Sequence, residues 1–470
     1  MPPLSRTAPE DAARRPPPVT RLWAAARHRV GRHPGLLVVL GLGALLRLLI
    51  DRHAVPGVYQ DSLVYLRASL RAPFAPYSPT RPSGYPLLLR ILHLLPGNQL
   101  DAVTMVQHVA GLAVGALVYV LVVRSGGRRW VAVAAAAVVL GEAFTVALEQ
   151  DILAEAFFTL AVVAAAYLTL RRSEGAWPQL VGGLLLGIAC TIRSVGIFAV
   201  PVWVLWLVLT RPGLRIVAAG VAAVALPVLG YSALHAWGGA GFSLQGSDGW
   251  FLYAKVGPIV DCRGASVPAG AEPLCVDPQP QRRPFEFYLY DGGSPAYQLF
   301  HGGKAVYLED AITPQNNRVL RQFSLAVIAA HPGSFLRLVG REFVHYLGPS
   351  TSQSELSLYG QPGTLLHWYE RWLHMRWWVL TGALAAGVAW LIWDGGPREL
   401  ALLVGLPAAL ILGAAATSGF NNRYLVPTFP LVIGAAALAA ERILRSREER
   451  ARRRRSGAGA DEADAVPAGQ

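Results

Sequence analysis

The sequence predicts an all-α membrane protein that crosses the bilayer several times. Hydrophobic residues make up 53% of its 470 residues and charged residues only 15%, and the mean hydropathy is +0.38. Apolar runs near membrane-spanning length recur along the chain, and they are too long for the strands of a membrane barrel. Because helices then remain as the structure that pairs every backbone polar group in lipid, we expect a bundle of about ten transmembrane helices.

The net charge of +13 is concentrated at the two ends of the chain. Residues 1–33 hold seven arginines against two acids, 445–455 repeat this ratio, and 237–376 balance eleven basic with eleven acidic residues. This placement is typical of the positive-inside rule rather than of a nucleic-acid interface. We therefore expect a multi-pass plasma-membrane protein with both termini in the cytoplasm and no nucleic-acid partner.

The expected organisation is a basic tail (1–33), a transmembrane domain (34–444) and a second tail (445–470) that is basic and then low in complexity. In chain order, the expected spans lie near residues 35–50, 102–123, 131–147, 153–170, 180–209, 215–236, 377–393, 400–417 and 425–444. Residues 180–209 are interrupted by Arg193 and form either one long helix or a hairpin of two short ones. The hairpin is favoured because it leaves the basic clusters on both sides of it in the cytoplasm.

Two polar segments, 51–100 and 237–376, are expected outside the cytoplasm. The first contains amphipathic pieces at 61–71 and 85–96, and the second contains helices at 315–347 that break at His331.

Cys262 and Cys275 flank a loop of glycine, proline and alanine on the expected oxidising side. We expect a disulfide between them, which would stabilise the fold by roughly 3 kcal/mol for a loop of ~15 residues.

Asp61 is the acid of the stretch Tyr59–Tyr65, just beyond the first apolar run. A lone carboxylate at the outer mouth of a helical bundle is a candidate catalytic base. The alternative is that Asp61 caps a surface helix, because apolar residues follow it at helical spacing.

Several stretches together resemble the GT-C membrane glycosyltransferases that use polyprenyl-phosphate sugars, with the protein O-mannosyltransferase and lipid A aminoarabinose transferase groups as the nearest relatives. The stretches that carry the resemblance are Asp61, Arg81–Leu89, Ile152–Phe158, Gly183–Gly196 and Asn422–Pro427. Two positions depart from the family pattern. Gln60 stands where a second acid is often found, and Glu155 stands where many members have aspartate.

The resemblance implies transfer of a sugar from a lipid phosphate to an acceptor hydroxyl outside the cytoplasm, with Asp61 as the base. Arg81, Arg193 and Arg423 are candidate partners of the donor phosphate, because a guanidinium binds phosphate oxygens bidentately and stays charged when partly buried. As alternatives, Arg193 snorkels to the interface, and Arg423 is an interfacial anchor with Tyr424.

Four further residues are candidates for acceptor binding or support, namely Glu155, Asp151, Tyr85 and Tyr424. Glu155 and Asp151 are equally explained as acids at a helix N-terminus. We expect no cofactor and no metal ligand set, although Asp61 with Glu155 could hold a divalent cation.

Six aromatic residues could stack on sugars or instead form a loop core or interfacial belt: Tyr231, Trp250, Phe251, Tyr253, Tyr288 and Tyr290.

The favoured function is therefore a membrane glycosyltransferase, hexosyl or pentosyl, whose partners are a polyprenyl-phosphate sugar, membrane lipids and a protein, polysaccharide or lipid acceptor. The alternative classes are a transporter or flippase of lipid-linked sugars, which often has paired halves that this sequence lacks, and a non-catalytic scaffold. Forty arginines accompany two lysines, which is typical of a high-GC genome such as that of an actinobacterium.

Overall fold

The computed structural model describes most of the chain. The described residues are 33–70, 80–94, 99–171, 175–210, 213–239, 241–275, 283–304, 306–348, 382–385, 387–389 and 398–463. The expected tail at 1–32 and most of the expected span at 377–393 lie outside them.

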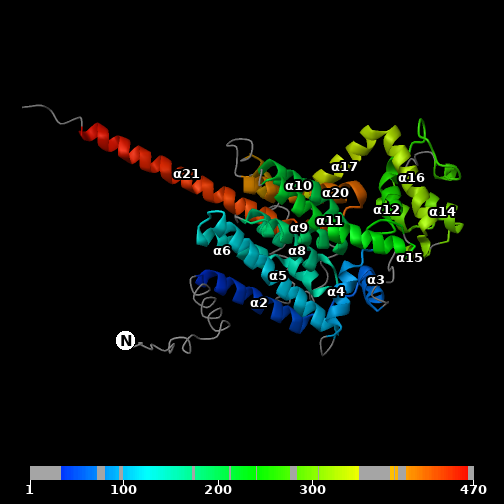
Figure 1. Cartoon of the computed structure of the whole chain (residues 1–470), viewed down its shortest axis with the longest axis horizontal. Coiled ribbons are helices and arrows are strands. Elements are labelled where there is room, and N and C mark those ends of the chain that lie inside the picture. Colours follow the sequence, from blue (N-terminus) through cyan, green and yellow to red (C-terminus); the bar gives the residue numbers. More distant parts are fainter. Residues whose placement is uncertain are drawn as a thin grey trace, which may run out of the picture.

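The described residues are helical and contain no strand; one isolated bridge pairs Gly57 with Asp151. The helices of the main bundle are α2 (Pro34–His53), α5 (Gln99–Arg124), α6 (Arg129–Gly141), α7 (Ala143–Gln150), α8 (Glu155–Leu170), α9 (Trp177–Ile192), α10 (Ala199–Thr210), α11 (Leu214–Trp237), α20 (Arg398–Thr417) and α21 (Phe429–Ala463). Two short helices, α3 (Gln60–Ser69) and α4 (Gly84–Leu92), lie at one end of this bundle (Figure 1). The all-α prediction is confirmed.

Four described helices, α2, α5, α11 and α20, are long and apolar enough to cross a membrane. Two bent pairs raise the number to six if each pair is one span: α6 with α7, and α16 (Pro314–Ala330) with α17 (Pro332–Leu347). The expected count of about ten is not confirmed, because α8, α9 and α10 are apolar but shorter than 18 residues. The break expected at His331 is present, where α16 and α17 meet at 101°.

Arg193 interrupts the 180–209 run as the sequence suggested. It has extended backbone angles between α9 and a 3-10 turn, Ser194–Phe198, which leads into α10. The alternative of one long helix is therefore wrong.

Close packing in the bundle depends on small residues. A Cβ at Gly183 would lie 2.6 Å from Gly220 O, and one at Gly187 would lie 2.4 Å from Pro227 Cγ. The spacing of Gly183 and Gly187 places both on one face of α9, against α11. This contact lets the two backbones approach more closely than larger side chains allow.

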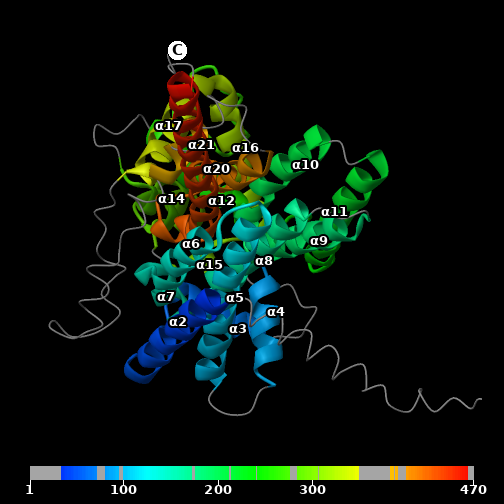
Figure 2. The ribbon, with the colours of Figure 1, turned by 90° about the vertical axis from the view of Figure 1, so that its left-hand side faces the viewer.

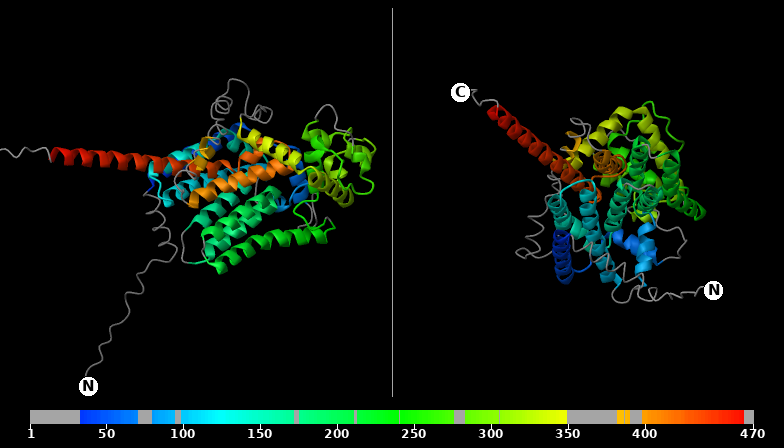
Figure 3. Two further views of the ribbon diagram at one scale, coloured as in Figure 1. Left: turned by 90° about the horizontal axis from the view of Figure 1, so that it is seen from above. Right: turned by 60° about the vertical axis from the view of Figure 1, so that its left-hand side comes forward.

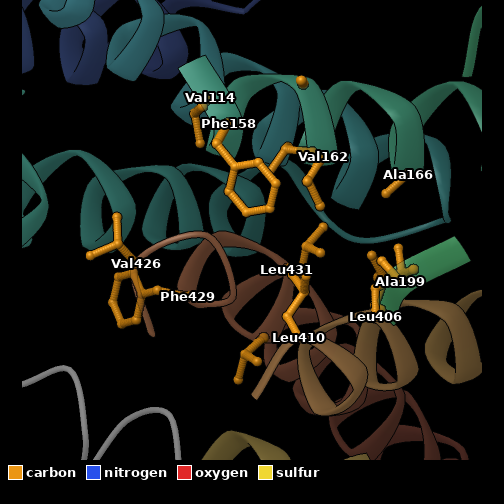
Figure 4. Close-up of a cluster of buried hydrophobic side chains, with 14 of the residues drawn as sticks. Val114, Phe158, Val162, Ala166, Ala199, Leu406, Leu410, Val426, Phe429 and Leu431 are labelled. Carbon is orange, nitrogen blue, oxygen red and sulfur yellow. The ribbon is translucent and has the colours of Figure 1, made fainter. Parts of the chain in front are cut away.

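The core of the bundle is apolar and joins helices that are distant in sequence. Figure 4 shows Phe158 of α8 beside Val114 of α5, with side chains of α20 and α21 below them. Phe158 is fully buried, and the same cluster continues through Leu410 and Leu431. The start of α21 packs against α20 and α5 in this core, which matters for the site described below.

A second core lies in the end lobe, which we define as residues 241–330. Its helices are α12 (Asp248–Val256), α13 (Phe285–Tyr290), α14 (Pro295–His301), α15 (Leu308–Ala311) and α16. The lobe sits at the end of the bundle that carries α3 (Figure 1), and Figure 2 views the molecule from the opposite end. Cys262 and Cys275 form a disulfide there, with their Cα atoms 5.7 Å apart.

A buried lysine joins the lobe to the bundle. Lys255 of α12 pairs with Glu342 of α17 and donates to Ser418 O, just beyond α20, at 3.1 Å. Since an unpaired buried charge is costly, this contact holds α12 at a defined distance from α20.

The opposite end of the bundle is basic. Figure 3 shows α21 running out of the bundle at that end. Arg128, at the start of α6, pairs with Glu441 at 3.2 Å and Glu448 at 2.6 Å, and Arg445 donates to Gly126 O. The connection between α5 and α6 is thereby tied to α21.

Candidate active site

Asp61 lies in the first turn of α3, where its negative charge interacts favourably with the helix dipole. The helix is not capped by Asp61. Tyr59 is at the N-cap position, and its backbone N–H donates to Ser62 Oγ at 2.9 Å. The side chain of Asp61 is left to bind elsewhere, so the capping alternative is wrong.

Asp61 belongs to an alternating chain of five charged side chains. Its Oδ1 accepts from Arg81 Nη2 at 2.6 Å, and its Oδ2 accepts from Arg423 Nη1 at 3.0 Å. Glu155 Oε1 accepts from Arg423 Nε at 2.6 Å and also from Arg193 Nη1. Residues up to 362 positions apart thus form one network, which we call the arginine–acid chain.

The charged groups of this network are close enough to shift one another's pKa values. Burial alone would raise the pKa of Asp61, but the charges and hydrogen bonds of Arg81 and Arg423 outweigh it and hold that pKa well below the usual range. Asp61 is therefore ionised at every physiological pH.

Arg81 is positioned by the turn that follows it. The Ser83 N–H donates to Tyr231 Oη at 3.0 Å, and the Tyr231 hydroxyl donates to Ser83 Oγ at 3.2 Å. A Cβ at Gly84 would lie 2.5 Å from Thr191 O, so a glycine is required where α4 meets the end of α9. The turn of Arg81 is pressed against the residues that lead into Arg193.

Arg423 lies in the 3-10 turn Asn422–Leu425, just before α21. The Asn421 side chain accepts a hydrogen bond from the backbone N–H of Arg423 at 2.9 Å, which fixes the start of this turn. Arg423 and Arg193 both bind Glu155, which is fully buried. Each guanidinium therefore has an ion-pair partner inside the protein.

The arginine–acid chain opens onto a cavity of about 590 Å³ between the bundle and the end lobe. Asp61, Arg81, Arg193 and Arg423 line it, and Glu155 lies behind them. The wall formed by the end lobe contains the aliphatic residues Leu244 and Leu252 together with aromatic and polar residues, among them Gln245, Asp248, Phe251, Phe285, Glu286 and Tyr290. The Arg81 guanidinium lies 5.6 Å from the centre of the Phe251 ring.

The remaining aromatic candidates divide by position. Phe251 and Tyr290 line the cavity, whereas Trp250, Tyr253 and Tyr288 are buried in the core of the lobe. Only the first two are placed to contact a ligand in this cavity.

The supporting candidates also lie in different places. Tyr424 lines the cavity, and its ring centre is 4.9 Å from the Arg193 guanidinium. Tyr85 is fully buried beneath the site, where its ring meets Tyr65 edge-on and its hydroxyl donates to Gln107 Oε1 at 2.8 Å.

Asp151 lies in the turn between α7 and α8, close behind Glu155. It is 1% exposed, and its Oδ2 has no hydrogen-bond partner among the described residues. Burial and then the charge of Glu155 raise the pKa of Asp151 to about 8. Asp151 is therefore mostly protonated at neutral pH and supports the site as a neutral group.

A second buried network, which the sequence did not reveal, holds this turn from below. Arg47 of α2 binds both oxygens of Glu149 at 2.7 Å, and His108 Nδ1 lies 2.9 Å from Glu149 Oε2. Gln107 Nε2 donates to Glu149 O at 2.8 Å and Asp151 O at 2.6 Å. A charged residue within an apolar run, as at Arg47, was the available signal.

The carboxylates of the site are paired with arginines in this arrangement. Both oxygens of Asp61 bind arginines, as does Oε1 of Glu155. In the described part of the chain, no three His, Cys, Asp or Glu side chains gather as metal ligands would.

Sequence comparison supports the resemblance noted above. Residues 80–233 match the model of the family described as dolichyl-phosphate-mannose-protein mannosyltransferase, which is about a third of the chain. This stretch contains Arg81, Glu155 and Arg193, while Asp61 and Arg423 lie on either side of it. The resemblance is confirmed over these residues. No curated protein matches the chain.

Solved structures resemble the chain only distantly. A chain of the S. cerevisiae protein O-mannosyltransferase complex bound to the sugar donor is 18% identical, over 43% of this chain and 32% of that one, with a TM-score of 0.31. ArnT from Cupriavidus metallidurans is 14% identical over 87% of this chain and 78% of that one, with a TM-score of 0.38. The oligosaccharyltransferase AglB from Archaeoglobus fulgidus is 13% identical over 86% of this chain and 50% of that one, with a TM-score of 0.41. The chain thus spans about a third of the length of the yeast protein and half of the archaeal one.

Proposed function

We propose that the protein is a membrane glycosyltransferase that moves a sugar from a polyprenyl-phosphate donor to an acceptor hydroxyl. The observation that carries the proposal is that Asp61 lies between Arg81 and Arg423 in an open cavity at one end of an apolar helix bundle. The family match over 80–233 supports the same reaction class.

The chemistry needs two kinds of group, and the cavity supplies both. In the step we propose, the bond between the sugar C1 and the phosphate oxygen breaks, and its electron pair leaves with the polyprenyl phosphate. The acceptor oxygen bonds to C1 and gives its proton to Asp61. Arg81, Arg193 and Arg423 supply positive charge where the leaving phosphate gains negative charge.

The wall formed by the end lobe is our candidate for acceptor binding. Phe251 and Tyr290 offer ring faces, and Gln245 and Glu286 offer hydrogen-bonding groups on this wall of the cavity. A protein, polysaccharide or lipid hydroxyl could enter there, and the donor sugar could be a hexose or a pentose.

We further propose that the cavity faces the outside of the cell and that both chain termini lie in the cytoplasm. The arginines at the opposite end, among them Arg128, Arg129 and Arg445, would then be cytoplasmic, in keeping with the positive-inside rule.

The test is a transfer assay with purified full-length protein in lipid nanodiscs. Polyprenyl-phosphate mannose and polyprenyl-phosphate arabinose are supplied separately, with a cell-envelope fraction as the source of acceptors. We expect one donor to be converted to free polyprenyl phosphate with its sugar joined to an envelope component. A companion assay in proteoliposomes covers the alternative: movement of lipid-linked sugar between the leaflets, without release of polyprenyl phosphate, would instead identify a transporter.

A further inference from the structure

Both oxygens of the candidate base are already occupied. Asp61 Oδ1 binds Arg81 and Asp61 Oδ2 binds Arg423, and both bonds are charge-assisted. A carboxylate held in this way has a pKa well below its usual range, which makes it a weak proton acceptor. The ligand-free arrangement is therefore poorly suited to deprotonating an acceptor.

The same arginines are the natural partners of the donor phosphate. The arginine–acid chain contains three guanidinium groups and two carboxylates, so it carries one uncompensated positive charge. Arg81 and Arg423 are 21% and 16% exposed and line the cavity, so an entering anion meets them there. An entering phosphate and Asp61 then compete for the same donors.

We propose that the donor phosphate takes over Arg81 and Arg423 from Asp61, so that Asp61 becomes an effective base only when the donor is bound. This inference rests on the proposed function and adds a regulation to it. Until the donor arrives, Asp61 acts as the internal counter-anion of the two arginines. After the exchange, its freed oxygens can accept the acceptor proton.

Asp61 rather than Glu155 is the carboxylate that gives way. Asp61 is 19% exposed and faces the cavity, whereas Glu155 is 0% exposed and lies behind the arginines. Glu155 also stays paired with Arg193 when Arg423 turns toward a phosphate. Releasing Glu155 would leave a buried charge without compensation, which is strongly unfavourable.

A different arrangement would leave Asp61 bound. Each guanidinium has five N–H groups, so a phosphate could bind those that Asp61 does not use, with Asp61 holding the arginines in place. The two arrangements predict opposite effects of removing the carboxylate. Exchange predicts that phosphate binds more tightly without its competitor, and positioning predicts that it binds less tightly.

The experiment measures the affinity of sugar-free polyprenyl phosphate for the full-length protein in nanodiscs, by microscale thermophoresis. Wild type is compared with Asp61→Asn and with Asp61→Ser, which removes the charge with a smaller side chain in case one variant fails to fold. Monodispersity and thermal unfolding are checked on each preparation. We expect both variants to bind the lipid phosphate more tightly, by roughly 5- to 150-fold as for other couplings between sites.

Asp248→Asn is the matched control for charge. Asp248 lines the same cavity but pairs with Arg321 at 3.1 Å, so its loss removes one negative charge without freeing Arg81 or Arg423. We expect its affinity to change by less than about threefold, as for a screened exposed pair.

Three results would overturn the exchange. Unchanged or weaker binding by the Asp61 variants shows that Asp61 does not compete with the phosphate, and equal tightening by Asp248→Asn shows a general charge effect. Both leave the proposed function intact, because wild type still binds the lipid phosphate. Absence of polyprenyl-phosphate binding by wild type would overturn the proposed function together with the exchange.

Discussion

Asp61 can be substituted without removing the contact that starts α3, because that contact is made by Tyr59 and Ser62. We expect Asp61→Asn to fold and to bind donor but to transfer sugar ~10²- to 10⁴-fold more slowly, the usual effect of losing a general base. Sugar transfer and thermal unfolding are measured on one preparation. Arg423→Ala should mainly weaken donor binding, since the phosphate charge it meets is present before reaction. Near-normal transfer by Asp61→Asn would exclude the catalytic role.

Asp151 gives the site a pH dependence of stability. Because its pKa is about 8 in the folded protein and near 4 when unfolded, the folded state binds more protons between these values. Asp151 therefore lowers the free energy of unfolding as pH rises from about 4 to about 8. Asp151→Asn removes this pH-dependent loss of stability. The melting temperature of the variant, relative to that of wild type, should therefore increase from pH 4 to pH 8, and exceed it by about 2 °C or more at pH 8.

The measurement is differential scanning fluorimetry in detergent at pH values from 5 to 9, with wild type and variant side by side. All other titrating groups are shared, so the difference between the two melting curves isolates Asp151. A difference that stays constant with pH would show that Asp151 is ionised throughout.

At the residue scale, the sequence identified the members of the arginine–acid chain but not their pairing. Asp61, Arg81, Glu155, Arg193 and Arg423 stood out because they lie in the stretches that resemble the GT-C glycosyltransferases. Partners such as Arg47 and Glu149, 102 positions apart, could not be paired from sequence, since helix packing alone brings them together. Tyr231 was noted for its ring, whereas its hydroxyl is what contacts Ser83.

Among the elements, the contact of α9 with α11 is sensitive to side-chain size. A Cβ at Gly187 would meet Val224 O at 2.5 Å as well as Pro227, and backbone atoms cannot move aside cheaply. We expect Gly187→Ala to lower the free energy of unfolding by ~1–3 kcal/mol through overpacking. Gly230→Ala on α11 is the matched control, because nothing lies within 4 Å of its Cβ position.

Both variants are compared by thermal unfolding in the same detergent. Gly230→Ala should match or exceed wild type, since alanine favours a helix over glycine by up to ~1 kcal/mol. Equal melting temperatures for the two variants would show that α9 and α11 are not closely packed. Because Arg193 follows α9 directly, Gly187→Ala should also reduce sugar transfer.

The apolar runs of the sequence predicted the positions of the helices well, but they did not predict the lengths of the helices. The run at 180–209 correctly indicated a break at Arg193, because a charge cannot sit in lipid without a partner. The count of about ten spans stays a prediction, because length and hydropathy alone do not show whether the shorter apolar helices α8, α9 and α10 cross the lipid. The helix α21 begins at Phe429, later than the start expected for the last span, since the preceding residues form the turn of Arg423.

For the whole molecule, composition was enough to predict an all-α membrane protein, yet it could not place the end lobe. Lys255 seats the lobe on the bundle through Glu342 and Ser418 O, contacts between segments 87 and 163 positions apart. That seating creates the cavity by setting Phe251 and Tyr290 opposite the arginine–acid chain. The catalytic candidates could be identified from the sequence, whereas the residues of the cavity wall in the end lobe could be identified only from the tertiary structure.

The orientation of the whole molecule is tested by two single cysteines at opposite ends. Ser125 is exposed beside Arg124 and Arg128, and Lys304 is exposed on the end lobe. With arginines retained in the cytoplasm, a membrane-impermeant maleimide added to intact cells should label Lys304→Cys and not Ser125→Cys. The native cysteines do not interfere, because Cys190 is buried and the other two are paired.

Permeabilised cells provide the control for this topology test, since Ser125→Cys should become reactive once the reagent enters. The expected pattern places the arginine–acid chain outside the cytoplasm, where a lipid-phosphate sugar must be presented after crossing the membrane. Labelling of Ser125→Cys in intact cells, with Lys304→Cys protected, would show that the protein has the reverse orientation in the membrane. The cavity would then open to the cytoplasm, and the donor and acceptor would both have to be cytoplasmic molecules.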